Sequence, residues 1–366
     1  MIPLFKVNIP HGYEASLLKT MNSGFIGEGP MVAKFEKNLG NYIGNFNVLS
    51  VNSGTSGLHL ALRLCDVGIG DEVISTPMTC TATNMPILER GAKIVWSDID
   101  PKTGSIDPES ISKKITKKTK AIVVVHWGGN VVNLERIKKI ASKNNIKIIE
   151  DAAHAFGSTY QNQKIGNHSD FIVFSFQAIK HLTTIDGGAV FCKSHEDFQR
   201  GKRLRWFGID RDQPRKDFRC EEDIIEHGYK FHMNDVSATI GIEQLKHIDK
   251  IINIHNNNWK YYIKNINESD EVQTIPINNE STTSAWLFTI HVKDRDKFIS
   301  EMTKNKIMVS RVHERNDNHT CFKEFKECLP GVEAFNKTQI SIPVGWWVTK
   351  EQREYISNCI NKFSGA

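Results

Sequence analysis

The chain has 366 residues, which is long enough to bury a large core and to form one large domain plus a smaller one. Its composition, 39% hydrophobic and 24% charged, is that of an ordinary globular protein, and its net charge of +5 is spread along the chain, which does not favour nucleic-acid binding. We find no apolar run of about 18 residues that would span a membrane, and Met1–Leu4 leads directly into a polar segment, unlike a signal peptide.

The first predicted element is a helix over Met31–Ile43. Its apolar residues Val32, Phe35 and Leu39 repeat at helical spacing and form one face. The preceding Gly27–Pro30 places a proline near the first turn, where its missing N–H is tolerated.

From about residue 48 to residue 192, short apolar runs alternate with helical patterns. The predicted strands are Val48–Val51, Glu72–Thr76, Lys93–Ser97, Ala121–His126, Lys147–Glu150, Phe171–Phe176 and Ala189–Cys192. Most are continuous in Val, Ile and Phe, which is typical of strands covered on both faces. The segments Leu58–Leu62 and Leu134–Ala141 between them have helical spacing. The pattern predicts an α/β fold with one seven-stranded, mostly parallel sheet covered by helices.

The character of the sequence changes after a helical stretch predicted over Asp235–Ile251. A long amphipathic stretch begins near Ile254, followed by a polar run at Asn278–Ser284 and a strand-like segment at Trp286–Val292. We therefore predict a large domain over residues 1–250 and a smaller C-terminal α+β domain over residues 251–366.

The seven cysteines are scattered and form no C-x-x-C pair. They are Cys65, Cys80, Cys192, Cys220, Cys321, Cys328 and Cys359. An odd, unpatterned set argues against a disulfide framework and against a zinc site, and it favours reduced thiols in a cytoplasm. We expect no metal.

The first segment with chemical meaning is Ser53–Leu58, between a strand and a helix. Free N–H groups at a helix start form a cradle for phosphate, and Gly54, Thr55 and Ser56 would supply a close approach and hydroxyl donors. The segment lacks the ending of a nucleotide P-loop, so the phosphate need not belong to a nucleotide. Taken alone, such a segment is more often a plain connector.

The second segment is Glu150–His154, at the carboxyl end of an apolar strand, where ligands collect in open α/β sheets. Asp151 can pair with a protonated ring nitrogen, and His154 would reach a neighbouring ring oxygen. The alternative is an aspartate that caps a helix, followed by a histidine on the helix face.

The third segment runs from Phe174 to Gly188, from an apolar strand into a polar loop closed by glycines. Lys180 lies in this loop between Ile179 and His181, and a lysine whose pKa is lowered by apolar surroundings can attack a carbonyl. Most lysines are solvated surface charges. The combination of a phosphate cradle, an acid and a lysine on one sheet is what pyridoxal phosphate (PLP) requires.

These residues resemble the sugar aminotransferases of the DegT/StrS family, a branch of the aspartate-aminotransferase fold (PLP transferase fold type I). The resemblance extends over nearly the whole chain, and the pattern from Ser175 to Gly188, with Lys180 and Thr183-Thr184, carries it most specifically. It implies that Lys180 is the catalytic residue and holds the cofactor as a Schiff base. The other cofactor-binding residues it implies are Gly54, Thr55, Ser56, Cys80, Asp151, His154, Ser175, Lys230 and Asn234.

The roles implied by the resemblance are specific. Asp151 pairs with the pyridine nitrogen, His154 contacts the phenolic oxygen, and Ser175 joins the phosphate cradle. The family forms homodimers with shared active sites, in which the segment around Lys230 reaches the neighbouring subunit's phosphate. This sequence has Lys230 where the family commonly has asparagine, and Cys80 or Met78 where it often has an aromatic residue that stacks on the ring.

The resemblance also implies the reaction, which is the transfer of an amino group from an amino acid to a nucleotide-linked 4-keto-6-deoxyhexose. L-glutamate is the leading candidate for the donor. The product would enter a surface glycan such as lipopolysaccharide O-antigen. The cofactor would alternate between PLP and pyridoxamine phosphate. Arg311, His313 and Arg315 are the candidate substrate contacts, with a solvated charged loop as the alternative. Other readings are transamination of a small phosphorylated ketone, a sugar dehydratase with the same cofactor, and a non-catalytic ligand-binding regulator.

Overall fold

The structure, a computed structural model, describes residues 1–10, 12–214, 217 and 223–365. The helices are α1 (Glu14–Asn22), α2 (Pro30–Ile43), α3 (Gly54–Leu64), α4 (Thr81–Glu89), α5 (Pro108–Lys114), α6 (Leu134–Lys143), α7 (His195–Arg205), α8 (Asp235–Leu245), α9 (Ile248–Asn265), α10 (Arg295–Lys304), α11 (Pro330–Thr338) and α12 (Lys350–Ser364). The strands are β1 (Val48–Val51), β2 (Glu72–Ser75), β3 (Lys93–Trp96), β4 (Thr119–Val125), β5 (Lys147–Asp151), β6 (Thr159–Tyr160), β7 (Gln163–Lys164), β8 (Phe171–Ser175), β9 (Gly188–Cys192), β10 (Val272–Thr274), β11 (Ser281–Thr282), β12 (Phe288–Val292) and β13 (Gln339–Ile342).

The predicted seven-stranded sheet is confirmed. Its order is β1-β9-β8-β5-β4-β2-β3. The strands from β8 to β3 in this order pair in parallel, and β9 pairs antiparallel with both of its neighbours. Parallel strands need crossover helices, which explains why helical segments separate the apolar runs in the sequence.

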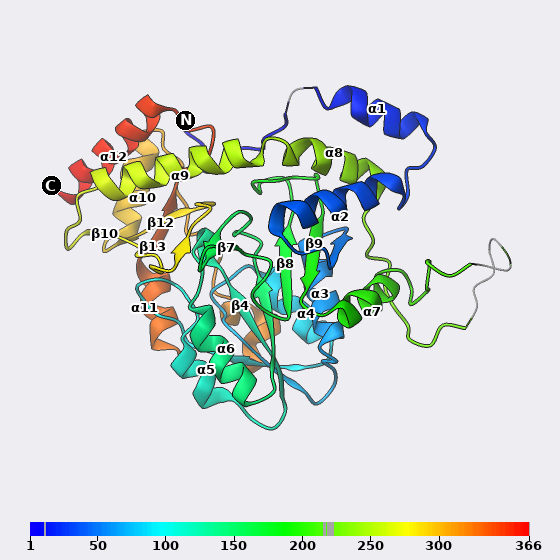
Figure 1. Cartoon of the computed structure of the whole chain (residues 1–366). Coiled ribbons are helices and arrows are strands. Elements are labelled where there is room, and N and C mark those ends of the chain that lie inside the picture. Colours follow the sequence, from blue (N-terminus) through cyan, green and yellow to red (C-terminus); the bar gives the residue numbers. More distant parts are fainter. Residues whose placement is uncertain (11, 215–216, 218–222, 366) are drawn as a thin grey trace.

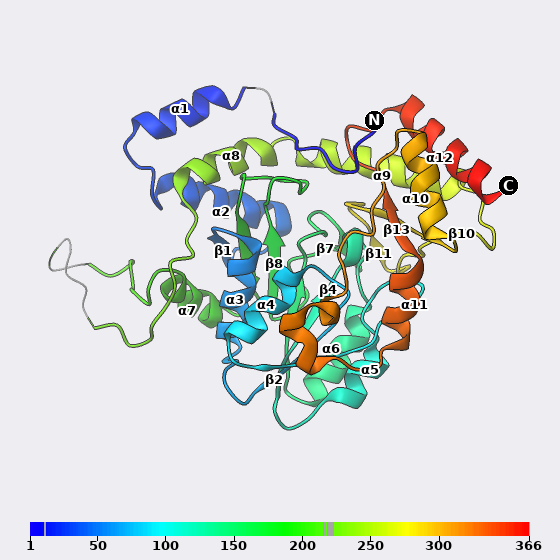
Figure 2. The ribbon, with the colours of Figure 1, turned by 180° about the vertical axis from the view of Figure 1, so that it is seen from behind.

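Both faces of this sheet are buried, which is why its strands are apolar without alternation. Ile148 belongs to the core cluster that contains residues of α2, α6 and α8, whereas its neighbour Ile149 belongs to the cluster that contains residues of α3, α7 and α11. Successive side chains of a strand point to opposite faces, so each face receives half of every apolar run. The helices lie on the two sides of the sheet in Figure 1 and in the reverse view of Figure 2.

The helical stretch predicted over Asp235–Ile251 is interrupted. It forms α8 and α9, with a break at residues 246–247 where the N–H of His247 bonds to the carbonyl of Gln244, three residues back, at 3.0 Å. This hydrogen bond spans three residues, whereas those of an α-helix span four, so the chain is wound more tightly here for one turn. Figure 1 shows the two helices as a nearly continuous rod that runs from the large sheet to the C-terminal part of the chain.

The C-terminal part has its own core around a three-stranded sheet of order β10-β12-β13. The strand predicted at Trp286–Val292 is β12, which begins two residues later. Helix α9 serves both parts of the molecule, because Ile248 and Ile252 pack into the core of the large sheet and Tyr262 packs into the C-terminal core. The division at residue 250 falls inside this helix, and we keep it as a proposal.

Both ends of the chain lie at this C-terminal part (Figures 1 and 2). Ile2 forms an isolated parallel bridge with Ile307, and the Trp347 indole N–H donates to the carbonyl of Pro3 at 2.8 Å. The first residues are therefore fixed beside the small sheet. In the described part of the chain no helix is long and apolar enough to cross a membrane. Six cysteines are free thiols there, and Cys220 lies outside the described residues.

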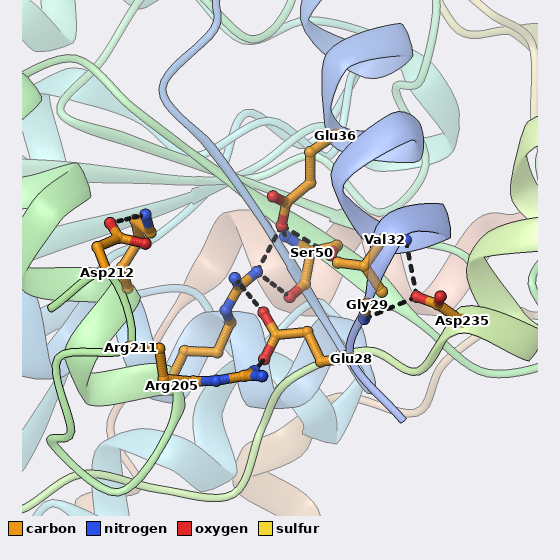
Figure 3. A network of polar contacts seen from close by, with 10 residues as sticks. Glu28, Gly29, Val32, Glu36, Ser50, Arg205, Arg211, Asp212 and Asp235 are labelled. Atoms are coloured by element: carbon orange, nitrogen blue, oxygen red, sulfur yellow. Dashed lines mark hydrogen bonds and ion pairs between the residues drawn. The ribbon is translucent and has the colours of Figure 1, made fainter. Parts of the chain in front are cut away.

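A buried network of charges fixes the start of α2 (Figure 3). The Asp235 carboxylate accepts hydrogen bonds from the N–H groups of Gly29 and Val32, both at 2.9 Å, and so caps α2 from another helix. Arg205, 4% exposed, pairs with Glu28 at 2.7 Å and with Glu36. Paired in this way, a buried guanidinium holds the ends of α2 and α7 in place.

Candidate active site

A cavity of about 280 Å³ opens at the carboxyl ends of β5 and β8. Its walls include Gly54 and Thr55 from the first predicted segment, Asp151 and His154 from the second, and Ser175 and Lys180 from the third. The three segments therefore meet in one place, as a site at the carboxyl edge of a parallel sheet requires.

The N-terminus of α3 forms one wall of the cavity. Ser53 caps the helix by accepting a hydrogen bond from the N–H of Ser56 at 3.0 Å, and the two hydroxyl groups lie 2.9 Å apart. The Ser56 N–H is used in this cap. In the first turn of α3, the N–H groups that have no partner among the described residues are therefore those of Gly54 and Thr55. Two free N–H groups at the positive end of a helix are suited to a phosphate.

Glycine at position 54 lets this helix end touch the sheet. A Cβ atom there would lie 2.9 Å from the Cβ atom of Ser175 and 3.3 Å from its hydroxyl oxygen. The absence of a side chain therefore brings the Ser175 hydroxyl beside the free N–H groups. These groups fit the phosphate of PLP.

Asp151 ends β5 and is 6% exposed. Its carboxylate accepts hydrogen bonds from the Thr83 hydroxyl at 2.7 Å and from the N–H of Ala153 at 3.1 Å. Two donors fix the orientation of a buried charge and compensate part of its lost hydration. Thr83, on α4, is a functional residue that the sequence did not predict, because nothing in the chain order shows that α4 faces the end of β5.

Lys180 lies in the loop after β8, half-buried. Burial lowers the pKa of its amine to about 8, and the nearby Asp151 and Cys80 oppose this shift. About a tenth of the amine is then neutral at pH 7, far more than for an ordinary lysine, and the neutral form is the nucleophile. This agrees with the predicted attack on a carbonyl.

His154, 5% exposed, is held in its neutral form. Burial first, and the charge of Lys180 second, keep its pKa well below the usual range. The N–H of Gly128 points at Nδ1 of the ring at 3.4 Å. Because a backbone N–H can only donate, Nδ1 must be the acceptor and the ring proton is assigned to Nε2. A neutral ring with an Nε2–H donor suits the predicted contact with a phenolic oxygen.

Trp286 is the second functional residue that the sequence did not predict, although it lies at the start of a predicted strand. Its ring stacks on His154 with the centroids 3.8 Å apart. The nitrogen of Lys180 lies 3.8 Å from the ring centre. The segment before β12 thus enters a site built mainly from segments around the large sheet.

Cys80 and Met78 differ in position. Cys80 precedes α4 and lines the cavity, whereas Met78 is 1% exposed and belongs to the core. Of the two, Cys80 is placed for a contact with the ring of a cofactor.

Lys230 and Asn234 are absent from the residues that line this cavity in the described part of one chain. Lys230 forms an isolated bridge with Trp206, and the Asn234 side chain caps α8 by accepting from the N–H of Ser237 at 2.8 Å. Their cofactor contacts remain predictions.

The three candidate substrate contacts differ in whether they reach the cavity and in whether their charge is already paired. His313 lines the cavity with its ring parallel to that of His154 at 5.7 Å, and its φ of 71° is left-handed, a strained backbone often found at functional sites. Arg311 is half-exposed and pairs with Glu314 at 3.1 Å. Arg315 is 5% exposed and makes two 2.7 Å bonds to Asp317, so its guanidinium is already used. We leave Arg315 out of the proposed substrate contacts.

Comparison with known proteins agrees with this geometry. A family model described as the DegT/DnrJ/EryC1/StrS aminotransferase family matches residues 11–361. The UDP-4-amino-4,6-dideoxy-N-acetyl-beta-L-altrosamine transaminase of Campylobacter jejuni serotype O:23/36 is 34% identical over 79% of this chain and 76% of its own.

Two solved structures extend the comparison. The sugar aminotransferase CalS13 from Micromonospora echinospora has a TM-score of 0.95 and 36% identity, covering 99% of this chain and 100% of its own. The PMP form of Spr1654 from Streptococcus pneumoniae, described as a sugar aminotransferase, has a TM-score of 0.93 and 27% identity, covering 100% and 99%. The predicted family, fold and cofactor are confirmed. The chain belongs to the DegT/DnrJ/EryC1/StrS aminotransferase family and is a PLP-dependent sugar aminotransferase.

Proposed function

We propose that the protein transfers an amino group from L-glutamate to the keto group of a nucleotide-linked 4-keto-6-deoxyhexose. The observation that carries the proposal is the meeting of Lys180, Asp151 and the start of α3 around one cavity. The sugar is supported by the name of the Campylobacter jejuni relative, which describes a nucleotide-linked 4-amino-4,6-dideoxy sugar. Such a product would enter a surface glycan such as an O-antigen, after synthesis in the cytoplasm.

Six residues of the cavity have a proposed task. Bound PLP supplies an aldehyde that accepts the amino group and a ring that delocalises negative charge. Lys180 holds the cofactor through its amine, and once displaced by the donor it moves the proton at the reacting carbon. Asp151 keeps the ring nitrogen protonated, and His154 donates its Nε2–H to the phenolic oxygen. Gly54, Thr55 and Ser175 hold the phosphate.

We also propose that two chains form a dimer with shared sites, in which Lys230 of one chain serves the phosphate bound by the other. Exposed apolar side chains support this arrangement. Phe25 is 66% exposed, and Ile185, in the same loop as Lys180, is 63% exposed with a left-handed φ of 74°. Exposed apolar patches often mark surfaces that contact another protein, and Ile185 places such a side chain in the loop that carries Lys180.

Lys180→Ala and its matched variant Lys180→Arg test the function. Purified protein is loaded with PLP and mixed with L-glutamate, and the cofactor absorbance near about 400–430 nm is followed. We expect this band to disappear in the wild type and to persist in both variants, because arginine keeps the charge but cannot be deprotonated to act as a nucleophile. A variant that transaminates at a rate comparable to wild type would remove Lys180 from the mechanism.

The acceptor is tested in the second half of the reaction. Pyridoxamine-loaded protein is mixed with a nucleotide-linked 4-keto-6-deoxyhexose or with a small phosphorylated ketone, and return of the band shows which one accepts the amine. Return with the phosphorylated ketone alone would overturn the proposed sugar. Sugar turnover without an amino donor would indicate a dehydratase, and no spectral change with any pair would indicate a ligand-binding regulator.

A further inference from the structure

We propose that Trp286 is a positioning residue for Lys180, and that its indole ring is the place where the free amine of Lys180 rests when it is not attached to the cofactor. The inference rests on the proposed role of Lys180 and deepens it. It assigns a task to a side chain that comes from the C-terminal part of the chain, about 100 residues away from the lysine loop.

Trp286 contacts the lysine loop in two ways. The Lys180 nitrogen lies 3.8 Å from the centre of the ring, within the range of a cation–π interaction. The indole N–H donates a hydrogen bond of 3.0 Å to the carbonyl of Ile179, the residue directly before Lys180. One side chain therefore holds both the amine and the backbone from which it extends.

The ring is itself fixed, so it can serve as a reference point. Trp286 is 3% exposed and packs in a small apolar cluster with Leu4 and Val312. His154 stacks on the ring at 3.8 Å and Phe5 at 5.0 Å. A side chain packed on several sides has little rotational freedom to lose, which is what a positioning residue requires.

The ring also borders both cavities around the lysine. It lines the cofactor cavity together with Asp151 and His154, and a smaller hollow behind it is lined by Phe5, Lys180 and Trp346. A free lysine amine without this support would be able to leave the reacting atoms between the two halves of the reaction. The aromatic face attracts the ammonium form and keeps it within reach.

The test measures the pKa and reactivity of Lys180 in the protein without cofactor. Trace acetic anhydride labels each amine in proportion to its neutral fraction, and peptide mapping at several pH values gives the pKa of Lys180. None of the variants alters the titratable groups that face this amine. These groups are Asp151, Cys80, His154, His181, Asp186 and His313.

Trp286→Leu removes the aromatic face but keeps an apolar side chain. We expect the pKa of Lys180 to fall by roughly half a pH unit or more, because the ammonium form loses its attraction to the ring. Trp286→Phe keeps an aromatic face without the indole N–H, and we expect a pKa close to wild type. Trp259→Leu, a matched loss of an indole in the C-terminal core, should leave the pKa unchanged. An unchanged or raised pKa in Trp286→Leu would overturn the proposal.

A second measurement uses the wild-type fold, in case Trp286→Leu does not fold. Lysine amines of the cofactor-free protein are methylated with ¹³C, and the signal of Lys180 is identified by its loss in Lys180→Arg. We expect this signal to be shifted upfield by the indole ring current, and a signal at the position of exposed lysines would refute the contact. Neither measurement needs cofactor or substrate, so a failure here is distinct from a failure of the proposed function.

Activity gives a third readout. In Trp286→Leu loaded with PLP, we expect the single-turnover rate with L-glutamate to fall roughly tenfold, while the dissociation constant of PLP stays near wild type, because positioning affects the reaction more than binding. Rescue by Trp286→Phe would show that the aromatic face is what matters. Equal loss of PLP affinity and rate in both variants would indicate a purely structural role and would contradict the proposal.

Discussion

Replacing Thr83 by valine, which has nearly the same shape, would test how Asp151 is held. The Thr83 hydroxyl donates to the Asp151 carboxylate at 2.7 Å and lies 2.8 Å from the Thr79 hydroxyl, with all three residues buried. A hydrogen bond to a charged group contributes about 1.5–3 kcal/mol. Valine would leave one carboxylate oxygen of the largely buried Asp151 without this donor.

The cost should appear in two measurements. Urea unfolding of the cofactor-free protein should show a loss of about 1.5–3 kcal/mol, since the lost bond stabilises only the folded state. The single-turnover rate with L-glutamate should fall by roughly ten- to a hundredfold, because a less firmly held carboxylate pairs less well with the ring nitrogen.

Two variants serve as controls. Thr83→Ser keeps the hydroxyl and should retain most of the rate. Thr79→Val removes only the neutral hydroxyl pair, worth about 1 kcal/mol, and should reduce stability more than rate. If Thr83→Val matches wild type in both stability and rate, the hydroxyl does not orient Asp151 and the reasoning is refuted.

Two further predictions follow from the lysine and from the phosphate cradle. Because the pKa of folded Lys180, about 8, lies below the value of about 10.4 for an unfolded lysine, the unfolded state binds more protons between these pH values and stability rises with pH there. Cofactor-free Lys180→Met should therefore be more stable than wild type at pH 7, by no more than about 3 kcal/mol. Urea titrations should show this difference in stability shrinking toward pH 10. Equal stability of the two proteins at every pH would contradict the lowered pKa. Gly54→Ala should weaken PLP binding at least tenfold, because its Cβ would lie 2.9 Å from the Cβ of Ser175. Gly68→Ala has open space around the new atom and should bind PLP normally. Equal affinities of the two variants in an absorbance titration would show that the close approach is not needed.

The sequence predicted the large sheet well because its physical signal is local. Strands buried on both faces must be apolar throughout, so runs such as Phe171–Ser175 are visible without knowledge of their neighbours. The cofactor segments were also visible, since each combines chemistry with a strand end within a few residues. The strand order was not visible, because it depends on pairings such as that of β9 with β1, two strands that lie far apart in the chain.

The rest of the site could not be predicted for the same reason. Thr83 and Trp286 look like ordinary residues of a helix and of a strand start, and only the folded chain shows that they contact Asp151 and Lys180. Arg315 illustrates the opposite case. Its charge suggested a substrate contact, but Asp317, two residues later, and Glu333 bind its guanidinium.

The most direct test of the account is to find the attachment point of the cofactor. The protein is loaded with PLP, reduced with borohydride so that any bond between an amine and the cofactor becomes permanent, digested, and mapped by mass spectrometry. We expect to find the cofactor on the peptide that contains Lys180 and on no other, and we expect no labelled peptide from Lys180→Ala. Cofactor attached to a different lysine in a protein that transaminates would contradict it.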